Sequence, residues 1–476
     1  MTVIVGRNGS GKSNVLEALV CIFRNLDLGE DPTFSYELVY QLGEKNTASW
    51  KEITIDADPN RGTLSKQYDV KVKNSDNLVF EAPFSKVTRD KNGKSDFLPN
   101  YVFAYYSGPS DRLESYFKKH RTNFYNKLLK DELNLKGDIR PLFYAKPHHS
   151  QFVLLAFFLS QETSPERAFL KEHLGIEALD SIHFVMRKPE WAKQKNEIFW
   201  GARGVVRRFL DDLIKFSLAP VKVTRHETTS LTGLGLKNEF FHLFLPNIQS
   251  LRDFSKDLSA DELFKMLEST LLSDIISEVR IRVKTTSSKE PLTFRELSEG
   301  EQQLLTVIGL LKFTGGKDSV FLLDEPDTHL NPSWAAKYLK FLREFVPNHD
   351  TSHLLMVTHH PLAIAELDKK QIQVMWKDEK YQSHAQMPEE SPKGMGINLI
   401  LRSDMFDMKT TLDDDTNTKL SRRNFLASKD QLTDDEEAEL KGINTELDKL
   451  GFNMASDDPD YMDFLRKKYH YKKATE

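Results

Sequence analysis

The sequence contains a single cysteine, Cys21, and no apolar run long enough to cross a bilayer. One cysteine excludes an intramolecular disulfide, and its apolar neighbours predict that it is a small core residue on a helix. The longest apolar run, FVLLAFFL at 152–159, is far shorter than a membrane span. No charged leader with an apolar signal segment opens the chain. We therefore expect a cytoplasmic protein from a reducing compartment, with no membrane partner.

The sequence also lacks an excess of positive charge, because its formal net charge is −5. Any binding to nucleic acid would therefore need local basic patches. Two stretches, 117–130 and 187–208, interleave basic and aromatic residues. Direct contact with DNA through these stretches and an ordinary solvated helix face are both open readings. The 39% of hydrophobic and 29% of charged residues are typical of a globular protein with several domains.

What the sequence does contain is a phosphate-binding loop, GRNGSGKS at Gly6–Ser13, between a β-branched run and a helical pattern. The backbone N–H groups of such a loop cradle phosphate oxygens, and the positive end of the following helix adds to the attraction. Lys12 is expected to reach the outer phosphates, and Ser13 to place its hydroxyl on Mg²⁺. The predicted nucleotide-binding residues are Gly6, Arg7, Asn8, Gly9, Ser10, Gly11, Lys12, Ser13 and Asn14.

Two apolar runs in the last third of the chain end in residues that suit phosphate chemistry. VFLLDE at 320–325 predicts a buried strand that delivers Asp324 and Glu325 at its carboxyl end, where ligands bind in open α/β sheets. Asp324 is expected to hold Mg²⁺, and Glu325 to orient and deprotonate the attacking water. HLLMVTHHP at 353–361 places His359 at another strand end, within reach of a γ-phosphate. A solvated strand end and a packing or surface histidine are the alternative readings.

Other motifs are less specific when taken alone. LSEGEQQ at 297–303 predicts a glycine turn at the start of a helix, another place where N–H groups collect anions. The pairs His148-His149 and His359-His360 lack metal-ligand spacing with other donors. We therefore predict no structural metal site.

Strands that alternate with helices predict an α/β fold with a mostly parallel sheet and an antiparallel part between 47 and 87. Residues near 110 to 285 are expected to be mostly helical, and the stretch after 394 is polar, acidic and helical in pattern. The expected domains are an N-terminal lobe with the phosphate loop (1–107), a helical insertion (108–290), a second lobe (291–393) and a helical tail as a candidate docking element (394–476).

The order of these motifs resembles the ABC-type ATPase head of chromosome-maintenance and DNA-repair ATPases. GRNGSGKS is similar to Walker A, LSEGE to the signature motif, VFLLDEP to Walker B with its catalytic glutamate, and VTH to the histidine switch. The resemblance implies ATP and Mg²⁺ as ligands. It also implies a head-to-tail homodimer, in which the signature residues of one subunit reach the ATP held by the loop of the other. These residues are Ser298, Glu299, Gly300 and Glu301.

Three features of the sequence depart from the family pattern. Asn331 stands where the D-loop of transporters has an aspartate, and EPDTHLNP resembles instead the soluble ATPases of overcoming-lysogenization-type and anti-phage defence systems. Ser107 lies where a Q-loop glutamine is usual, and is a candidate substitute for it. The family carries an antiparallel hairpin before Walker A, which this sequence lacks. We expect either a truncated chain or a misassigned start, and this puts adenine recognition in question.

The spacing of the motifs along the chain indicates which subfamily of ABC-type ATPases the sequence resembles. The stretch from Ser107 to Leu297 is short and has no heptads, which excludes a long coiled-coil arm. The acidic tail lacks the pattern of a fused nuclease. The layout is most similar to the ATPase subunit of Septu-type defence (PtuA) and to ATPases found beside restriction systems. Both imply an ATPase that works with a separately encoded nuclease, of HNH type for Septu. A nucleotide-bound scaffold with little turnover, which holds its partner inactive, and a DNA-repair-type ATPase are the alternatives.

The tail carries one further pattern. Thr433 and Glu436 predict a capping box at the start of a helix. An apolar stripe then recurs along one face of this helix, and Gly451 is the expected stop. The stripe consists of Leu440, Ile443, Leu447 and Leu450. It is expected either to pack on the chain's own ATPase head or, with residues 458–469, to dock a partner nuclease or a second protomer.

Overall fold

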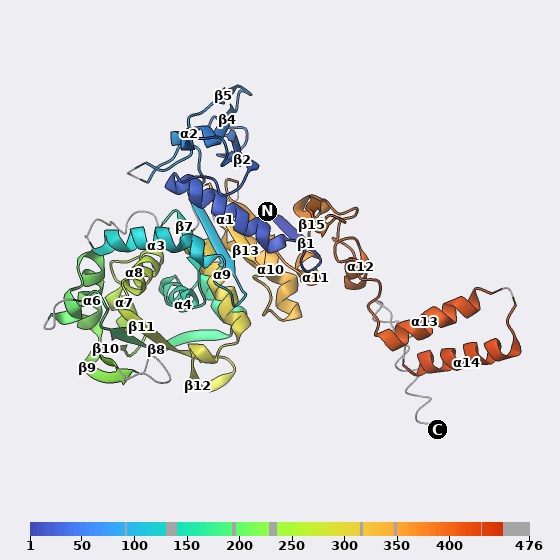
Figure 1. The fold of residues 1–476 in the computed structure, drawn as a ribbon. Coiled ribbons are helices and arrows are strands. Elements are labelled where there is room, and N and C mark those ends of the chain that lie inside the picture. Colours follow the sequence, from blue (N-terminus) through green and yellow to red (C-terminus); the bar gives the residue numbers. More distant parts are fainter. Residues whose placement is uncertain are drawn as a thin grey trace. The chain divides into compact units, whose positions relative to one another are not determined.

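The structure, a computed structural model, describes residues 1–90, 93–129, 140–192, 197–227, 236–314, 318–346, 350–429 and 431–450. Contacts divide the chain into two compact units, Met1–Ile397 and Asn398–Glu476. The expected helix stop at Gly451 and the segment 458–469 lie outside the described residues, as do Lys130 and residues 193–196 of the two basic stretches. The α/β fold class is confirmed: the first unit holds a mostly parallel sheet, antiparallel sheets and helices (Figure 1).

The centre of the first unit is a seven-stranded sheet in the order β16-β15-β1-β14-β13-β6-β7. Neighbouring strands run parallel except β15 and β16. The middle residues of β13 are fully buried, as expected for a parallel strand covered on both faces. The carboxyl ends of β1, β13 and β14 therefore meet at one edge of the sheet. The strands are β1 (Thr2–Gly6), β6 (Tyr101–Tyr106), β7 (Leu142–Ala145), β13 (Ser319–Asp324), β14 (His353–Val357), β15 (Ile372–Lys377) and β16 (Ser383–Gln386).

The segments that connect these strands contain the helices α1 (Lys12–Leu28), α9 (Glu299–Thr314), α10 (Pro332–Phe345) and the short α11 (Pro361–Ile364), with a 3₁₀ turn η4 at Lys369–Gln371. Asn331 is the N-cap of α10, because its side chain accepts a 2.9 Å hydrogen bond from the Trp334 amide. Pro332 occupies the first helical position, where a backbone N–H would have no partner within the helix, so the lack of an N–H in proline costs nothing there. The Asn331 side chain therefore starts a helix.

The antiparallel strands expected between 47 and 87 form a four-stranded sheet in the order β2-β3-β4-β5. Ile53 and Ile55 alternate with more exposed residues and are fully buried. They belong to one apolar core with Leu16 and Val20 of α1, so this sheet packs on the helix that follows the phosphate loop. The elements are β2 (Tyr36–Leu42), β3 (Lys51–Ala57), α2 (Leu64–Gln67), β4 (Tyr68–Asn74), β5 (Val79–Glu81) and the 3₁₀ turn η1 (Phe84–Lys86).

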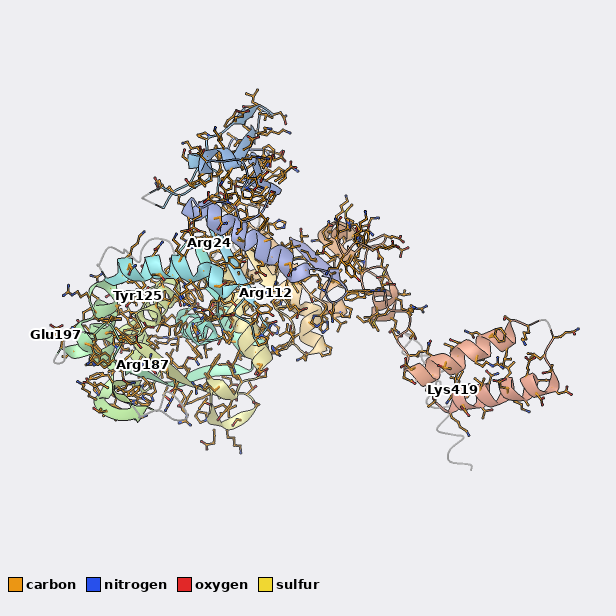
Figure 2. The ribbon with its side chains drawn as sticks, in the orientation of Figure 1. Arg24, Arg112, Tyr125, Arg187, Glu197 and Lys419 are labelled. Carbon is orange, nitrogen blue, oxygen red and sulfur yellow. The ribbon has the colours of Figure 1, made fainter. Side chains whose placement is uncertain are left out.

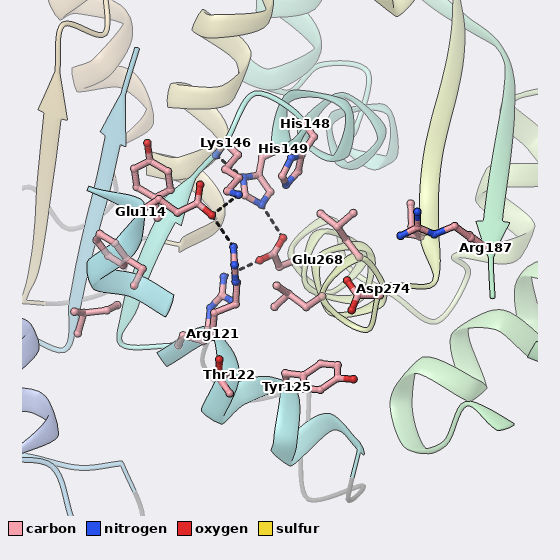
Figure 3. A pocket seen from close by; sticks show the side chains of 17 residues that line it. Glu114, Arg121, Thr122, Tyr125, Lys146, His148, His149, Arg187, Glu268 and Asp274 are labelled. Atoms are coloured by element: carbon pink, nitrogen blue, oxygen red, sulfur yellow. Dashed lines mark hydrogen bonds and ion pairs between the residues drawn. The ribbon is translucent and has the colours of Figure 1, made fainter. Parts of the chain in front are cut away.

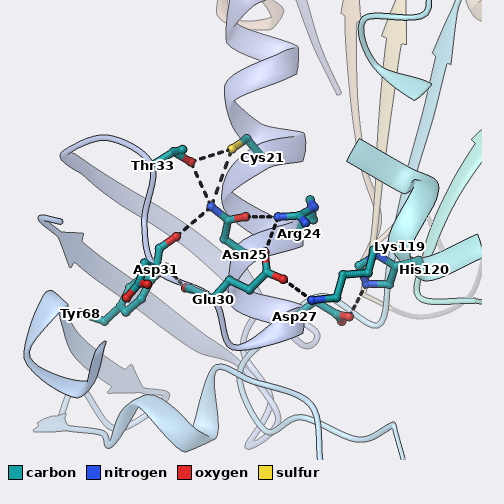
Figure 4. A network of polar contacts seen from close by, with 10 residues as sticks. All are labelled: Cys21, Arg24, Asn25, Asp27, Glu30, Asp31, Thr33, Tyr68, Lys119 and His120. Atoms are coloured by element: carbon teal, nitrogen blue, oxygen red, sulfur yellow. Dashed lines mark hydrogen bonds and ion pairs between the residues drawn. The ribbon is translucent and has the colours of Figure 1, made fainter. Parts of the chain in front are cut away.

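A polar network fixes the carboxyl end of α1 (Figure 4). The Asp27 carboxylate is buried between the Arg89 guanidinium and the imidazole of His120, whose Nε2 lies 2.6 Å from it. Cys21 is buried, as predicted, and its sulfur lies 3.1 Å from the Thr33 hydroxyl. Because His120 belongs to α3 (Glu114–Leu129), the network joins the loop's helix to the insertion.

The expectation that residues near 110 to 285 are mostly helical needs correction. Besides α3, the insertion holds α4 (His149–Leu159), α5 (Pro165–Glu172), α6 (Gly204–Phe216), α7 (Ile248–Phe254) and α8 (Ala260–Leu272), with the 3₁₀ turn η2 (Ile198–Gly201). It also holds β8 (Ile176–Arg187), β9 (Leu218–Glu227), β10 (Leu236–Leu245) and β11 (Ile276–Thr285). With β12 (Ser288–Thr293), these form a five-stranded antiparallel sheet in the order β12-β11-β8-β10-β9. A further 3₁₀ turn, η3 (Phe294–Glu296), lies in the second lobe.

Strand β11 shows why the helical expectation failed. Its residues alternate between buried and exposed, so the period is two and not 3.6. In contrast, α4 is buried along nearly its whole length and packs on α8 of the insertion and on α9 of the second lobe. An apolar helix of this kind gives no amphipathic signal that would separate it from a buried strand.

The second unit contains α12 (Ile397–Arg402) from its second residue on, together with α13 (Asp414–Ala427) and α14 (Asp434–Lys449). The predicted capping box at the start of α14 is confirmed: Thr433 accepts a hydrogen bond from the Glu436 amide, and the Glu436 carboxylate accepts one from the Thr433 amide. Leu447 is fully buried, whereas Leu450 is 63% exposed. Ion pairs from Lys419 to Glu446 and from Arg422 to Glu439 link α13 to α14. The two helices therefore form a hairpin.

In the part of the chain that the structure describes, no helix is both long and apolar enough to cross a membrane.

Candidate functional site

The phosphate loop connects β1 directly to α1. The Lys12 ammonium donates hydrogen bonds to the carbonyl oxygens of Gly6, at 2.8 Å, and Arg7, at 3.1 Å, so it folds back into its own loop. Burial lowers the pKa of Lys12. A side chain at Gly6 would collide with the Met375 carbonyl of β15, which explains the glycine. Asn8 and Gly9 lie exposed at the loop's tip, and Ser10 is buried.

Ser13 and Asp324 meet at the carboxyl edge of the sheet. The Ser13 hydroxyl donates a 3.0 Å hydrogen bond to Oδ1 of Asp324, which is fully buried at the end of β13. Burial raises the pKa of the Asp324 carboxyl to about 6. Among the described residues, Oδ2 of Asp324 has no hydrogen-bond partner although it is buried. A buried oxygen without a hydrogen-bond partner is unusual in a folded protein and is consistent with a site for an ion. A hydroxyl and a carboxylate oxygen are ligands that suit Mg²⁺.

Glu325 and His359 form a second pair beside the first. Nδ1 of His359 lies 3.0 Å from Oε1 of Glu325. This hydrogen bond lowers the pKa of Glu325 and raises the pKa of His359. Glu325 has φ 49°, a left-handed conformation that is costly for a residue with a side chain and is concentrated at functional sites. Sequence analysis placed both residues at strand ends, and the structure brings them into contact.

Sequence analysis missed two residues at this edge. The Asp327 carboxylate accepts a 2.7 Å hydrogen bond from the Thr358 hydroxyl, which ties the segment after β13 to the end of β14. Arg112, which is labelled in Figure 2, donates to the Asn14 side-chain oxygen at 2.8 Å and to the Glu17 carboxylate. Arg112 follows β6, the neighbour of β13, so its place after the apolar run YVFAYY at 101–106 was the available signal.

The remaining predicted residues lie elsewhere on the same unit. The Ser298 amide donates a 2.6 Å hydrogen bond to the Glu301 carboxylate, and the Ser298 hydroxyl accepts one from the Glu301 amide, which forms a capping box at the start of α9. Ser298 and Glu299 are exposed and Gly300 is buried. The hydroxyl of Ser107 lies 3.2 Å from that of Thr328, and the Ser107 amide donates to the Asp324 carbonyl. Ser107 thus contacts the segment around Asp324 at the end of β13.

Comparison with known families agrees with this arrangement. A family model described as "AAA domain, putative AbiEii toxin, Type IV TA system" matches residues 1–148 and 232–365, more than half of the chain. The chain belongs to this AAA-domain family. Both matched segments contain strands of the central sheet, and between them they carry the phosphate loop, Asp324, Glu325 and His359.

Two further proteins are similar to this member of the AAA-domain family. Septu protein PtuA of Bacillus mycoides (strain KBAB4) is 23% identical over 226 residues, which are 44% of this chain and 31% of that protein. The chain thus spans less than a third of the length of this curated relative. The SMC head domain from Thermotoga maritima is 11% identical, with a TM-score of 0.27, over 82% of this chain and 90% of that chain.

The insertion of this AAA-domain protein contains a cavity of about 430 Å³ between α3, α4 and α8 (Figure 3). His148 and His149 line it with Glu268, and the ligand atoms of the three residues lie within 4.8 Å of one another. Sequence analysis found no other donor near this histidine pair, because Glu268 is distant in the sequence.

The hydrogen bonds of this group leave no ligand set for a metal. The Lys146 amide donates to Nδ1 of His149, so the proton of this imidazole is on Nε2. Nε2 donates to Glu268, which also accepts a 2.7 Å hydrogen bond from Arg140. Although burial opposes it, the contacts with His149 and Arg140 keep the pKa of Glu268 well below its usual value. A metal ligand would have to be deprotonated at Nε2, so this group is an internal ion-pair network.

Three residues of the basic stretch on α3 form ion pairs within the protein. Lys119 pairs with Glu30, His120 with Asp27 and Arg121 with Glu114. These pairs reduce the positive charge that the stretch offers to a phosphate backbone.

Proposed function

We propose that the chain binds ATP with Mg²⁺ at Gly6–Ser13 and hydrolyses it. The Ser13–Asp324 contact carries this proposal, because it joins a phosphate loop to a buried carboxylate with an unpartnered oxygen. Ser13 and Asp324 would hold Mg²⁺, which would neutralise negative charge on the phosphates. Membership of an AAA-domain family supports the same reading.

Lys12 and Glu325 have separate roles in this proposal. The Lys12 ammonium would exchange its contacts with the Gly6 and Arg7 carbonyls for oxygens of the β- and γ-phosphates. Glu325 would act as the general base: its lowered pKa keeps it ionised at neutral pH, ready to accept a proton from the attacking water. His359, 3.0 Å from Glu325, would orient that carboxylate and contact the γ-phosphate.

The exposed start of α9 supports a site shared between two copies of the chain. Ser298 and Glu299 face solvent at a helix N-terminus, where backbone N–H groups attract anions. In a head-to-tail homodimer, this turn would meet the ATP held by the other copy's loop. ATP would then link two heads, and hydrolysis would release them.

We further propose that these heads regulate a separately encoded nuclease of an anti-phage defence system. The similarity to Septu protein PtuA supports this role, and the resemblance to Septu-type ATPases suggests an HNH-type partner. The second candidate is a scaffold that binds ATP, turns over little and holds its partner inactive. The Glu325–His359 pair favours keeping that candidate, because the proposed base is already hydrogen-bonded.

A single-turnover ATPase assay on the wild type and on Glu325→Gln separates the two candidates. General-base catalysis contributes about 10²–10⁴-fold, so a hydrolase should lose about this factor in Glu325→Gln. ATP binding should be unchanged, because the substitution keeps the side chain's size. Equal and very slow rates in both proteins would favour the scaffold.

A further inference from the structure

The hairpin of β15 and β16 lies directly against the phosphate loop. β15 runs parallel to β1, with Gly6 paired to Met375, so the two strands end at the same edge of the sheet. The Ser383 hydroxyl at the start of β16 donates a 2.8 Å hydrogen bond to the Ser10 carbonyl. A residue of the hairpin therefore contacts the loop that would hold the phosphates.

The strand order gives a bound nucleotide a direction. Ser13 and Asp324 mark the Mg²⁺ end of the site, and Asp324 belongs to β13, on one side of β1. The β15–β16 hairpin lies on the opposite side of β1. A nucleotide whose terminal phosphates face Asp324 therefore extends its nucleoside towards the hairpin.

The hairpin exposes aromatic rings near this edge. Trp376 is 42% exposed and stacks on His384 across the two strands, with ring centroids 4.7 Å apart and planes at 27°. Tyr381 in the connecting turn is 83% exposed. Exposed aromatic rings on a hairpin whose Ser383 contacts the phosphate loop are suited to stacking on a ligand ring.

Hydrogen bonds to one carboxylate hold the turn in shape. Asp378 accepts from the amides of Lys380 and Gln382 at 2.9 and 2.8 Å, and lies 3.0 Å from Nε2 of His384. These hydrogen bonds order the backbone of the turn that carries Tyr381, which reduces the backbone entropy that a ligand stacking on it would cost.

We propose that Trp376 and Tyr381 form the nucleobase subsite of this protein, with the base stacked on their exposed rings. The inference rests on the proposed function, since it requires a nucleotide on Gly6–Ser13. The β15–β16 hairpin would thus supply the contact with the base, and this contact would not require any element before β1. Because every base has a π-face, stacking of this kind discriminates little between ATP and GTP.

The test compares the binding of ATP, GTP and inorganic tripolyphosphate, each with Mg²⁺, to the full chain by isothermal titration calorimetry. Tripolyphosphate engages the phosphate loop and lacks a base. The wild type should bind ATP and GTP with similar affinity, and each at least about tenfold more tightly than tripolyphosphate. Trp376→Ala and Tyr381→Ala should each lose about tenfold in ATP affinity and keep the affinity for tripolyphosphate.

Matched variants separate stacking from a general disturbance. Trp376→Phe and Tyr381→Phe retain an aromatic face and should restore most of the ATP affinity. Phe80→Ala removes an aromatic residue on β5 that is 45% exposed, and should leave all three ligands unaffected. Retained tripolyphosphate binding shows that each alanine variant is folded. Tyr381→Ser, in the exposed turn, is the second variant if Trp376→Ala does not fold.

The outcomes distinguish this inference from the proposed function. Unchanged ATP affinity in both alanine variants, with tripolyphosphate still bound, would overturn the base subsite alone. A wild type that binds neither ATP nor tripolyphosphate would overturn the nucleotide site and the subsite with it.

Discussion

The backbone of Gly300 lies so close to that of His329 that a β-carbon on Gly300 would overlap the His329 carbonyl oxygen. Gln303 reinforces this approach, because its side chain accepts from the His329 amide at 3.2 Å and donates to the Glu325 carbonyl at 3.4 Å. The turn that begins α9 is therefore packed against the segment that follows Glu325. Movement of α9 would be transmitted to the proposed catalytic carboxylate.

Gly300→Ala should disturb this packing. The overlap forces the segment after β13 to shift, at a cost of about 1–3 kcal/mol in the free energy of unfolding. Urea denaturation measures this cost, and the ATPase rate should fall because Glu325 moves with the segment. Gly442→Ala is the matched control, since a β-carbon at Gly442, on α14, would meet no other atom within 4 Å. Equal urea midpoints for Gly300→Ala and the wild type would show that the close approach of Gly300 to His329 has no effect on stability.

Ser298→Arg tests whether two copies of the chain share a site. The substitution places a bulky cation at the exposed start of α9, so it should block hydrolysis and leave ATP binding by an isolated head intact. Lys12→Ala should block hydrolysis through the other half of the site. An equal mixture of both variants should recover about a quarter of the wild-type rate, because half of the dimers are mixed and each has one intact site. Failure to recover activity at any mixing ratio would argue against shared sites.

The apolar stripe of α14 contributes to the α13–α14 hairpin, as the burial of Leu447 shows. The double substitution Ile443→Asp with Leu447→Asp should therefore unfold this hairpin, seen as a loss of helical circular dichroism. ATP binding by Met1–Ile397 should be unchanged, since that unit has its own core. Ala438→Asp with Asn444→Asp adds the same charge at exposed positions and is the control. If the stripe variant kept full helicity and lost a partner in a pull-down, the stripe would be a docking surface.

His148 makes the protein sensitive to acid. Burial, followed by the neighbouring His149, lowers the pKa of His148 to about 3. Between that value and the ordinary histidine pKa, the unfolded chain binds a proton that the folded chain excludes, so stability falls as the pH falls below about 6.5. This group should account for about 2 kcal/mol of lost stability between pH 7 and pH 5. His148→Phe, compared with the wild type by urea denaturation at both pH values, should remove that share. An identical loss in both proteins would contradict the assignment.

The parts of the fold that the sequence predicted are those whose signals are local. Gly6–Ser13 is a continuous motif, and Asp324 and His359 each follow an apolar strand, so their meeting at one edge follows from parallel strands. The antiparallel sheet of the insertion was missed although β11 alternates between buried and exposed residues from Val279 on, because its partner β8 is distant in the sequence. The contacts of Arg112 with α1 and of Glu268 with His149 depend on tertiary structure and have no local pattern.

The central claim is that Gly6–Ser13 holds ATP with Mg²⁺, and equilibrium dialysis of labelled ATP against the wild type and Lys12→Ala tests it most directly. The Lys12 ammonium lies within the loop. Replacing Lys12 by alanine would therefore remove the cation that is proposed to contact the outer phosphates. The account predicts Mg²⁺-dependent binding by the wild type and loss of binding by Lys12→Ala, with the fold retained by circular dichroism. Equally tight binding by a folded Lys12→Ala variant would contradict the account.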